Sequence, residues 1–369
     1  MANPTNYDRK KAFKYFFSAV GIAVLLMFLY WLLLARGHES TDNAYVAAPQ
    51  IQLTAQVDGV ISSMNTYETQ EVKAGQLLMR IDPTEAKINS AIADAELLRV
   101  YRASRAAVLV ATQRKAEFER IEQDWNRRAQ LTDLAALSEE EMDHLRSQKQ
   151  QAQAAYKESV ERSAGLIHLE QAINHPDVEK AKAAATQAYV ALLRTQVLSP
   201  VDATVAKRNA QVGQRVNPSS AVATLVIHGD TWVDANFKED QLGRMRKGQD
   251  AILEADVYGS SVTYKGKIIG FSPATGANMS LLPAQNATGN WVKVVQRLPV
   301  RIALDPDELQ SHPLQLGLSM NVTVDTSKQE GERLNASSES ESSHTLIYEN
   351  QLVEAEKHVK TLLSHSPKP

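Results

Sequence analysis

The chain has 369 residues, of which 43% are hydrophobic and 6% aromatic, so it can form two or three compact units but suggests no single large core. Its formal net charge of −3 gives no reason to expect a nucleic acid partner, because that binding requires concentrated Lys and Arg. The absence of cysteine excludes disulfides, thiolate nucleophiles and cysteine-bound zinc.

An uncharged apolar run occupies residues 16–35, and a helix of that length spans about 30 Å of hydrocarbon. Only Arg36 follows the run closely, whereas four basic residues precede it: Arg9, Lys10, Lys11 and Lys14. The positive-inside bias predicts a single-pass anchor with residues 1–15 in the cytoplasm and the rest of the chain outside. A cleaved signal peptide is the alternative, although its apolar region normally has only about 7–15 residues.

Two short segments of the chain repeat each other. Residues 57–81 align without a gap to residues 201–225, and five identical pairs coincide: Val57/Val201, Asp58/Asp202, Asn65/Asn209, Gln70/Gln214 and Val72/Val216. Because neither half can bury its apolar face alone, the repeat predicts one small β-sandwich with halves at residues 41–83 and 199–228. Val60 and Val205 are expected to face the shared core.

Between the two halves lies an Ala- and Gln-rich, almost glycine-free stretch that predicts a long antiparallel α-helical hairpin over residues 84–198. Apolar residues at helical spacing are expected to form the seam between its helices: Ile88, Ile92, Ala95, Leu98, Ala106, Leu109 and Ala116. The descending limb is expected to be interrupted at residues 174–177, where Pro176 suits the first turn of a new helix.

The helical pattern breaks near residues 131–138, which places the tip of the hairpin there. Ser138 is expected to cap the second helix, and Glu141, three residues later, completes a capping box. The acidic residues 139–141 also suit the positive end of a helix dipole. They are therefore interpreted as a cap rather than as a general acid/base pair, which needs burial to separate the two pKa values.

After the second repeat half, short β-patterned segments predict a small antiparallel β-barrel over residues 229–326. Residues 327–369 form a polar tail whose Ser/Glu-rich part cannot bury enough apolar area to order itself. One weak amphipathic helix is expected near its end, with Leu352, Ala355, Val359 and Leu362 on one face. The predicted fold class is an elongated α+β chain with an N-terminal transmembrane helix, a split sandwich carrying the hairpin, and a barrel.

Signals of catalysis are missing from the sequence. The sandwich halves resemble lipoyl and biotinyl carrier domains, but the lysine motif that such carriers modify does not occur, and the helical insertion stands where that turn would lie. The nine histidines form no His-Glu-x-x-His pattern, and no cluster of acidic residues stands at the spacing of metal ligands. The sequence therefore predicts no enzyme, no cofactor and no metal site.

Three stretches are more specific: TDNAYV at residues 41–46, WVDANFKE at residues 232–239, and the long string over residues 281–302. They resemble the HlyD family of periplasmic adaptors, also called membrane fusion proteins, and within it the EmrA type of multidrug efflux adaptor. The resemblance runs from residue 41 to about residue 325. It implies a lipoyl-like domain, a helical hairpin and a β-barrel domain, and the Ser-rich tail departs from the family pattern.

The same resemblance implies a non-catalytic adaptor anchored in the inner membrane with most of the chain in the periplasm. Its expected partners are a major-facilitator drug exporter, a TolC-like outer-membrane channel and further copies of itself. In related adaptors the hairpin tip meets the channel through an Arg, a Leu four residues later and a Ser seven residues after that; Arg127, Leu131 and Ser138 stand at this spacing. Two alternatives remain open: a type I secretion adaptor working with an ABC exporter, and a membrane-tethered ligand-binding protein.

Overall fold

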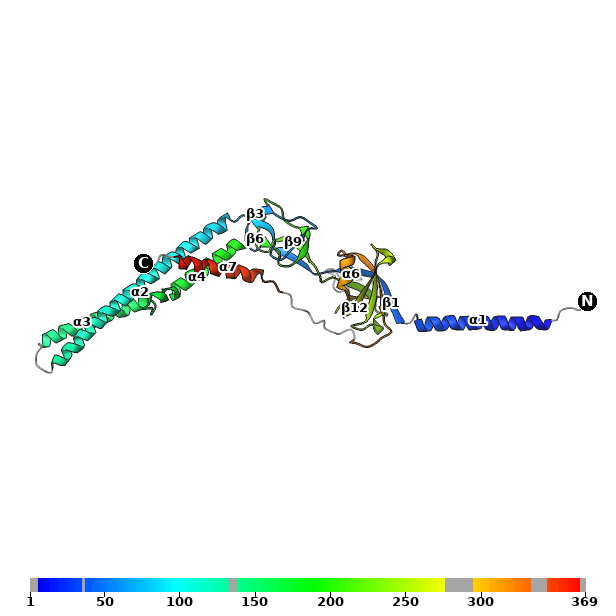
Figure 1. Ribbon diagram of the computed structural model, residues 1–369, viewed down its shortest axis with the longest axis horizontal. Helices are drawn as coiled ribbons and strands as arrows, with labels where there is room; N and C mark the ends of the chain where they lie inside the picture. Colours follow the sequence, from blue (N-terminus) through cyan, green and yellow to red (C-terminus); the bar gives the residue numbers. More distant parts are fainter. Residues whose placement is uncertain (1–5, 35–36, 133–137, 276–294, 333–343, 366–369) are drawn as a thin grey trace, which may run out of the picture. The chain divides into compact units, whose positions relative to one another are not determined.

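The computed structural model describes residues 6–34, 37–132, 138–275, 295–332 and 344–365. The chain divides into two compact units (Figure 1). The first consists of residues 1–51 and 226–343, and the second of residues 52–225 and 344–369. Each unit is therefore assembled from segments that are distant in the sequence.

The predicted membrane span falls in helix α1 (Asn6–Leu34). Its side chains between residues 13 and 27 are exposed, including Phe16, Leu25 and Met27. Across the described ranges, the structure contains no helix that is long and apolar enough to cross a membrane. The transmembrane anchor and its orientation thus remain predictions from the sequence.

The first unit contains the predicted β-barrel, which is closed and has the strand order β1-β10-β13-β12-β11-β14. Its strands are β1 (His38–Ala47), β10 (Trp232–Lys238), β11 (Asp250–Ala255), β12 (Thr263–Phe271), β13 (Arg297–Leu304) and β14 (Ser319–Asp325). Short helices join them: η3 (Leu242–Arg244), η4 (Gly259–Ser261) and α6 (Pro306–Ser311). Strand β1 lies in the barrel, although the sequence analysis placed residues from 41 onward in the sandwich.

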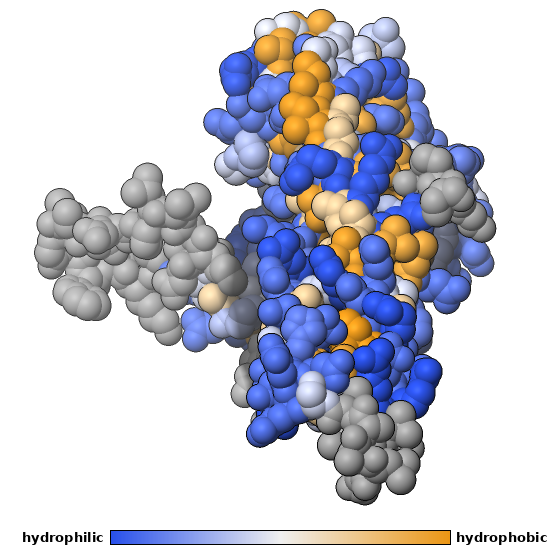
Figure 2. Space-filling view, turned by 90° about the vertical axis from the view of Figure 1, so that its left-hand side faces the viewer, coloured by the Kyte–Doolittle hydropathy of each residue, from blue (hydrophilic) through white to orange (hydrophobic). Residues whose placement is uncertain are grey.

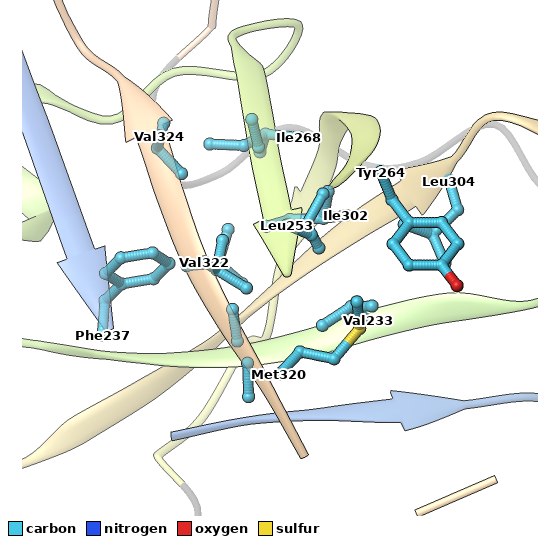
Figure 3. Close-up of a cluster of buried hydrophobic side chains, with 14 of the residues drawn as sticks. Val233, Phe237, Leu253, Tyr264, Ile268, Ile302, Leu304, Met320, Val322 and Val324 are labelled. Atoms are coloured by element: carbon cyan, nitrogen blue, oxygen red, sulfur yellow. The ribbon is translucent and has the colours of Figure 1, made fainter. Parts of the chain in front are cut away.

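The barrel closes around side chains that alternate along its strands and point inward, and Figure 3 shows Val233, Leu253, Ile302 and Val322 among them. Val233, Phe237 and Tyr264 are completely buried, in a pattern in which every second residue of a strand faces the core. Strands β12 and β13 approach closely at Gly266, where a Cβ atom would lie 2.7 Å from the carbonyl oxygen of Ala303. Only glycine fits there without displacing the backbone.

The sandwich of the second unit has two four-stranded sheets, ordered β2-β9-β7-β4 and β6-β5-β3-β8. The first repeat half and its approach supply β2 (Gln50–Thr54), β3 (Gly59–Met64), β4 (Glu71–Val72) and β5 (Leu77–Ile81). The second half supplies β6 (Gln196–Leu198), β7 (Ala203–Arg208), β8 (Arg215–Val216) and β9 (Ala221–Ile227). Both sheets mix strands from the two halves, so the prediction of one shared sandwich is confirmed.

Equivalent residues of the repeat make equivalent hydrogen bonds. The amide of Ile61 donates to the carbonyl oxygen of Gln214 at 2.9 Å, and the amide of Val205 donates to that of Gln70 at 2.9 Å. The side chains of these two glutamines each accept from the amide three residues earlier, at 3.0 and 3.1 Å. Each half therefore donates to the other half at the equivalent position, as expected for an internal two-fold repeat.

The prediction that Val60 faces the core of the sandwich is wrong. Val205 is 1% exposed, as expected, but Val60 is 39% exposed, and the buried side chain is that of Ile61 at 1%. The repeat alignment itself matches Val205 with Ile61, and successive residues of a strand face opposite sides of the sheet. A one-residue error in register therefore placed Val60 on the wrong face.

The hairpin comprises α2 (Thr84–Thr132), α3 (Glu139–Arg162), η2 (Leu169–Asn174) and α4 (Pro176–Leu193), with α2 packed against both α3 and α4 (Figure 1). At 49 residues, α2 is about 70 Å long. The interruption before Pro176 is confirmed: His175 is the N-cap of α4, and its Nδ1 accepts from the amide of Asp177 at 3.2 Å.

The predicted seam of α2 is wrong. Ile88, Ile92 and Leu109 are each more than half exposed. Four buried positions instead recur every seven residues, namely Ser90, Leu97, Ser104 and Ala111, and Val108 is buried between the last two. A heptad with two serines gives a weak hydrophobic signal, yet small residues let helices approach closely, and Ser104 Oγ donates to the carbonyl oxygen of Ala172 at 2.9 Å.

The C-terminal amphipathic helix is present as α7 (Ile347–Ser364), and Ala355 and Val359 are buried as predicted. Leu352, predicted on the same face, is 48% exposed, and Leu363 is buried in place of Leu362. It belongs to the second unit and packs against α4 and α2. The sequence analysis had treated the tail only as a polar segment with a weak helix. The other parts of that tail, residues 333–343 and 366–369, lie outside the described residues.

Candidate functional site: the tip of the hairpin

Side-chain contacts between α2 and α3 hold the outer part of the hairpin together. Phe118 stacks on Tyr156 with ring centroids 6.0 Å apart, and the guanidinium of Arg146 lies 5.9 Å from the ring of Trp125. Lys149 Nζ lies 3.0 Å from a carboxylate oxygen of Glu122. These cross-helix pairs fix the two helices that carry the candidate tip residues.

Arg127 lies in the last turns of α2, and its side chain is 73% exposed. An ion pair joins its Nη2 to Asp124 Oδ1 at 3.3 Å, three residues earlier on the same helix. Exposed pairs of this kind contribute only about 0.3–0.5 kcal/mol. The guanidinium can therefore turn to another acceptor at little cost.

Ser138 is the N-cap of α3, and the predicted capping box is confirmed. Its hydroxyl accepts from the amide of Glu141 at 3.3 Å and donates to Glu141 Oε2 at 3.0 Å. The hydrogen bonds from the amide and hydroxyl of Ser138, together with the charge of Arg128, lower the pKa of Glu141. Ser138 is thus already occupied in the cap, and only a remaining lone pair of its oxygen is open to a partner.

Leu131 belongs to the last turn of α2, but its side chain lies outside the described part of the structure, as do residues 133–137 of the tip. Arg127 and Ser138 belong to the ends of α2 and α3 that face the tip (Figure 1). Two of the three residues chosen from sequence spacing are therefore brought to one end of the hairpin.

A polar groove runs between α2 and α3 below the tip, and the residues that line it include Asp124, Arg128, Glu140, Glu141 and His144. Figure 2, which shows the molecule from the side on which the hairpin is drawn in Figure 1, presents a mostly hydrophilic face with hydrophobic residues in limited areas. Within the described ranges, no group of three or more His, Asp or Glu side chains could hold a metal ion. The arrangement suits polar recognition of a protein surface.

Sequence reasoning missed an exposed apolar row on the outer face of α2. Ile88 and Ile92, one helical turn apart, are 55% and 63% exposed, and Leu109 and Val110 continue the apolar character farther along the helix. The signal was present as helical spacing, but it was assigned to the seam inside the hairpin. Exposed apolar rows on a long helix are typical of contacts with another protein.

The two most specific stretches of the barrel have structural roles. Residues 41–46 and 232–239 pair as neighbouring strands, with Ala44 opposite Ala235. Thr41 Oγ1 donates to the carbonyl oxygen of Asn236 at 2.9 Å, and the amide of the Asn236 side chain donates to Asn43 at 3.2 Å. Residues 281–294 of the third stretch lie outside the described residues.

The chain is similar to known transport proteins along most of its length. Residues 49–228 match the family model described as the RND MFP barrel-sandwich hybrid domain. Multidrug export protein EmrA of Escherichia coli is 38% identical over 83% of this chain and 81% of its own length. Fatty acid resistance protein FarA of Neisseria gonorrhoeae is 42% identical over 78% of this chain and 76% of its own.

Among solved structures, that of MacA from Actinobacillus actinomycetemcomitans is similar in fold. It has a TM-score of 0.52 at 20% sequence identity and covers 78% of this chain and 79% of its own. At this identity, the similarity concerns the fold alone.

Proposed function

Because this chain belongs to the HlyD family of membrane fusion proteins, and within it to the EmrA type, we propose that it is the periplasmic adaptor of a tripartite multidrug efflux pump. Members of this family are non-catalytic adaptors, and so is this chain. The observation that carries the proposal is the identity with EmrA over most of both chains, together with a hairpin inserted between two cross-paired sandwich halves.

The proposed partners are an inner-membrane exporter of the major-facilitator type and a TolC-like outer-membrane channel. The tip supplies the contact with the channel: Arg127 offers an exposed charge that is held by one weak ion pair, and Leu131 and Ser138 stand at the spacing of related adaptors. A charge-assisted hydrogen bond from a guanidinium is well suited to a carbonyl or carboxylate of the channel. The barrel and the anchor are assigned to the exporter side.

Several copies of the chain assemble in this proposal, with their hairpins side by side. The exposed Ile88 and Ile92 of α2 support this, because a neighbouring hairpin would remove them from water. Burial of one such side chain is worth about 1.5–3 kcal/mol. Repeated around a ring of copies, this contact would contribute to a closed conduit.

Residues 16–35 are proposed to anchor the chain in the inner membrane, with residues 1–15 in the cytoplasm. We expect a reporter enzyme that is active only outside the cytoplasm to be active when fused after residue 60, because the basic flank retains the N-terminus inside. The matched control is the same reporter fused after residue 10, which should be inactive. Activity of a cytoplasm-specific reporter at residue 60 would contradict the envelope location and, with it, the proposed function.

A further inference from the structure

The base of the hairpin, where α2 and α4 lie together, presents an apolar seam to a third helix. Leu97 of α2 and Val178 and Ala185 of α4 are completely buried, and Ala93 and Tyr101 pack at the edges of the same cluster. The side chains that complete this cluster come from α7. The seam is thus a helix-sized acceptor surface with an occupant in place.

Helix α7 meets the seam with one face only. The buried residues recur every fourth position: Gln351, Ala355, Val359 and Leu363. The opposite face is exposed, including Val353 at 63%. In proteins most of the stability of a helix comes from the packing of its apolar face, so the stability of this 18-residue helix depends on this face being covered.

A polar contact fixes the register of α7 on the seam. His358 Nε2 lies 2.9 Å from Asp94 Oδ2, and the imidazole ring stacks on Tyr189 of α4 with centroids 4.1 Å apart and an angle of 14°. Asp94 Oδ1 is buried and has no hydrogen-bond partner among the described residues. His358 is therefore the hydrogen-bond partner of this carboxylate, through Oδ2. Burial and the negative charges of Glu354 and Asp94 raise the pKa of Tyr189 beside it.

The start of α7 is tied to the sandwich side of the same unit. Thr345 Oγ1 donates to the carbonyl oxygen of Pro200 at 2.9 Å, just ahead of the first turn. The helix is thus held at both ends, by Thr345 before its first residue and by Val359 and Leu363 near its last. Apolar contact alone is not directional, whereas the hydrogen bonds of Thr345 with Pro200 and of His358 with Asp94 specify one position of the helix.

We propose that the α2–α4 seam is a binding site for an amphipathic helix that carries a histidine opposite Asp94, and that α7 of the same chain is its occupant. With α7 bound, three helices instead of two pack together at the base of the hairpin. The attachment through residues 327–346 makes binding within one chain favourable, because a tethered partner is present at high effective concentration.

Hydrogen exchange on the full-length chain tests the occupancy of the seam. We expect the backbone amides of α7 to exchange at least tenfold more slowly than those of a free peptide of residues 344–365. Val359→Asp should remove this protection, whereas Val353→Asp, on the exposed face of the same helix, should change it less than twofold. Exchange of α7 at the rate of the free peptide in the unaltered chain would overturn the proposal.

The polar contact has its own matched pair of variants. His358→Ala should increase the exchange rate of α7 several-fold, because it leaves the carboxylate of Asp94 without its partner. His365→Ala, at the C-terminal end of the same helix, should leave the rate within twofold. Equal effects of the two variants would contradict a specific role of His358.

Crosslinking distinguishes binding within one chain from exchange between copies. Lys87 of α2 and Glu354 of α7 line the same small groove. Because the chain contains no cysteine, replacing both residues by cysteine introduces only these two thiols. With a short bis-maleimide, Lys87→Cys/Glu354→Cys should give a product of single-chain size. A covalent dimer formed from a mixture of the two single variants would show that the occupant is α7 of a second copy, and would overturn the same-chain assignment.

Discussion

Replacing Val205 by Asp is expected to unfold the sandwich. The side chain is 1% exposed on β7, in the core that both repeat halves share. A carboxylate placed there loses its hydration without compensation, which costs on the order of 3 kcal/mol or more. Since both sheets contain strands from the two halves, residues 57–81 and 201–227 should become sensitive to proteolysis together.

Val60→Asp is the matched control for this substitution. Val60 lies on β3, next to the buried Ile61, but is itself 39% exposed and points away from the core. The added carboxylate stays in water there, so the free energy of unfolding should change by only about 0.5 kcal/mol. Equal loss of stability in the two variants, measured by urea unfolding, would contradict the register of the sandwich.

Replacing Arg127 by Asp is expected to abolish drug efflux without destabilising the hairpin. The side chain is 73% exposed, so the loss of its pair with Asp124 should cost only a few tenths of a kcal/mol of stability. A carboxylate at this position would fail to pair with, or would repel, the group on the channel that accepts the guanidinium. The cost in interface free energy should be about 2–5 kcal/mol, which corresponds to at least a tenfold loss of affinity.

The matched control for the tip variant is Arg99→Asp. Arg99 lies on the same helix, is 69% exposed and pairs with Glu96 three residues earlier, but it is far from the tip along α2. Cells that lack the native adaptor should regain drug resistance with Arg99→Asp and fail to regain it with Arg127→Asp. Normal efflux with Arg127→Asp, together with undiminished crosslinking to the channel from a cysteine at position 135, would refute the tip assignment and leave Ser138 as a helix cap.

Local signals predicted most of the architecture. The gapless repeat predicted the shared sandwich because its register is carried by identical residues such as Gln70 and Gln214, which repeat the same turn hydrogen bond. The capping box at Ser138 and the proline that opens α4 were also local, since each depends on residues within one helical turn. Such features are encoded by short-range chemistry that a sequence displays directly.

The faces of the helices were harder to predict. Two regular patterns coexist on α2. One is apolar, contains Ile88 and Ile92, and is exposed; the other is made of small residues and leucine, contains Ser90, Leu97 and Ser104, and is buried. Hydrophobicity favours the first, whereas close packing with α4 requires the small residues of the second. Only the three-dimensional partner decides between them.

The contact of α7 with the hairpin could not be predicted from periodicity at all. His358 and Asp94 are 264 positions apart, and neither stands in a motif with a known spacing. The amphipathic pattern of α7 indicated that one face would be covered, but not by which element. The seam that covers it was itself assigned to the wrong face of α2, so the match between the two surfaces was not visible in the sequence.

Purification of the tagged full-length chain from cell envelopes, followed by mass spectrometry of the proteins that remain bound, tests the adaptor function most directly. The account predicts that both a major-facilitator exporter and a TolC-like outer-membrane channel are recovered, and that Arg127→Asp loses the channel while it retains the exporter. An ABC exporter in place of the major-facilitator protein would contradict the proposed partner. Recovery of neither transporter nor channel with an intact chain, especially if the same preparation binds a small ligand tightly, would contradict the adaptor function itself.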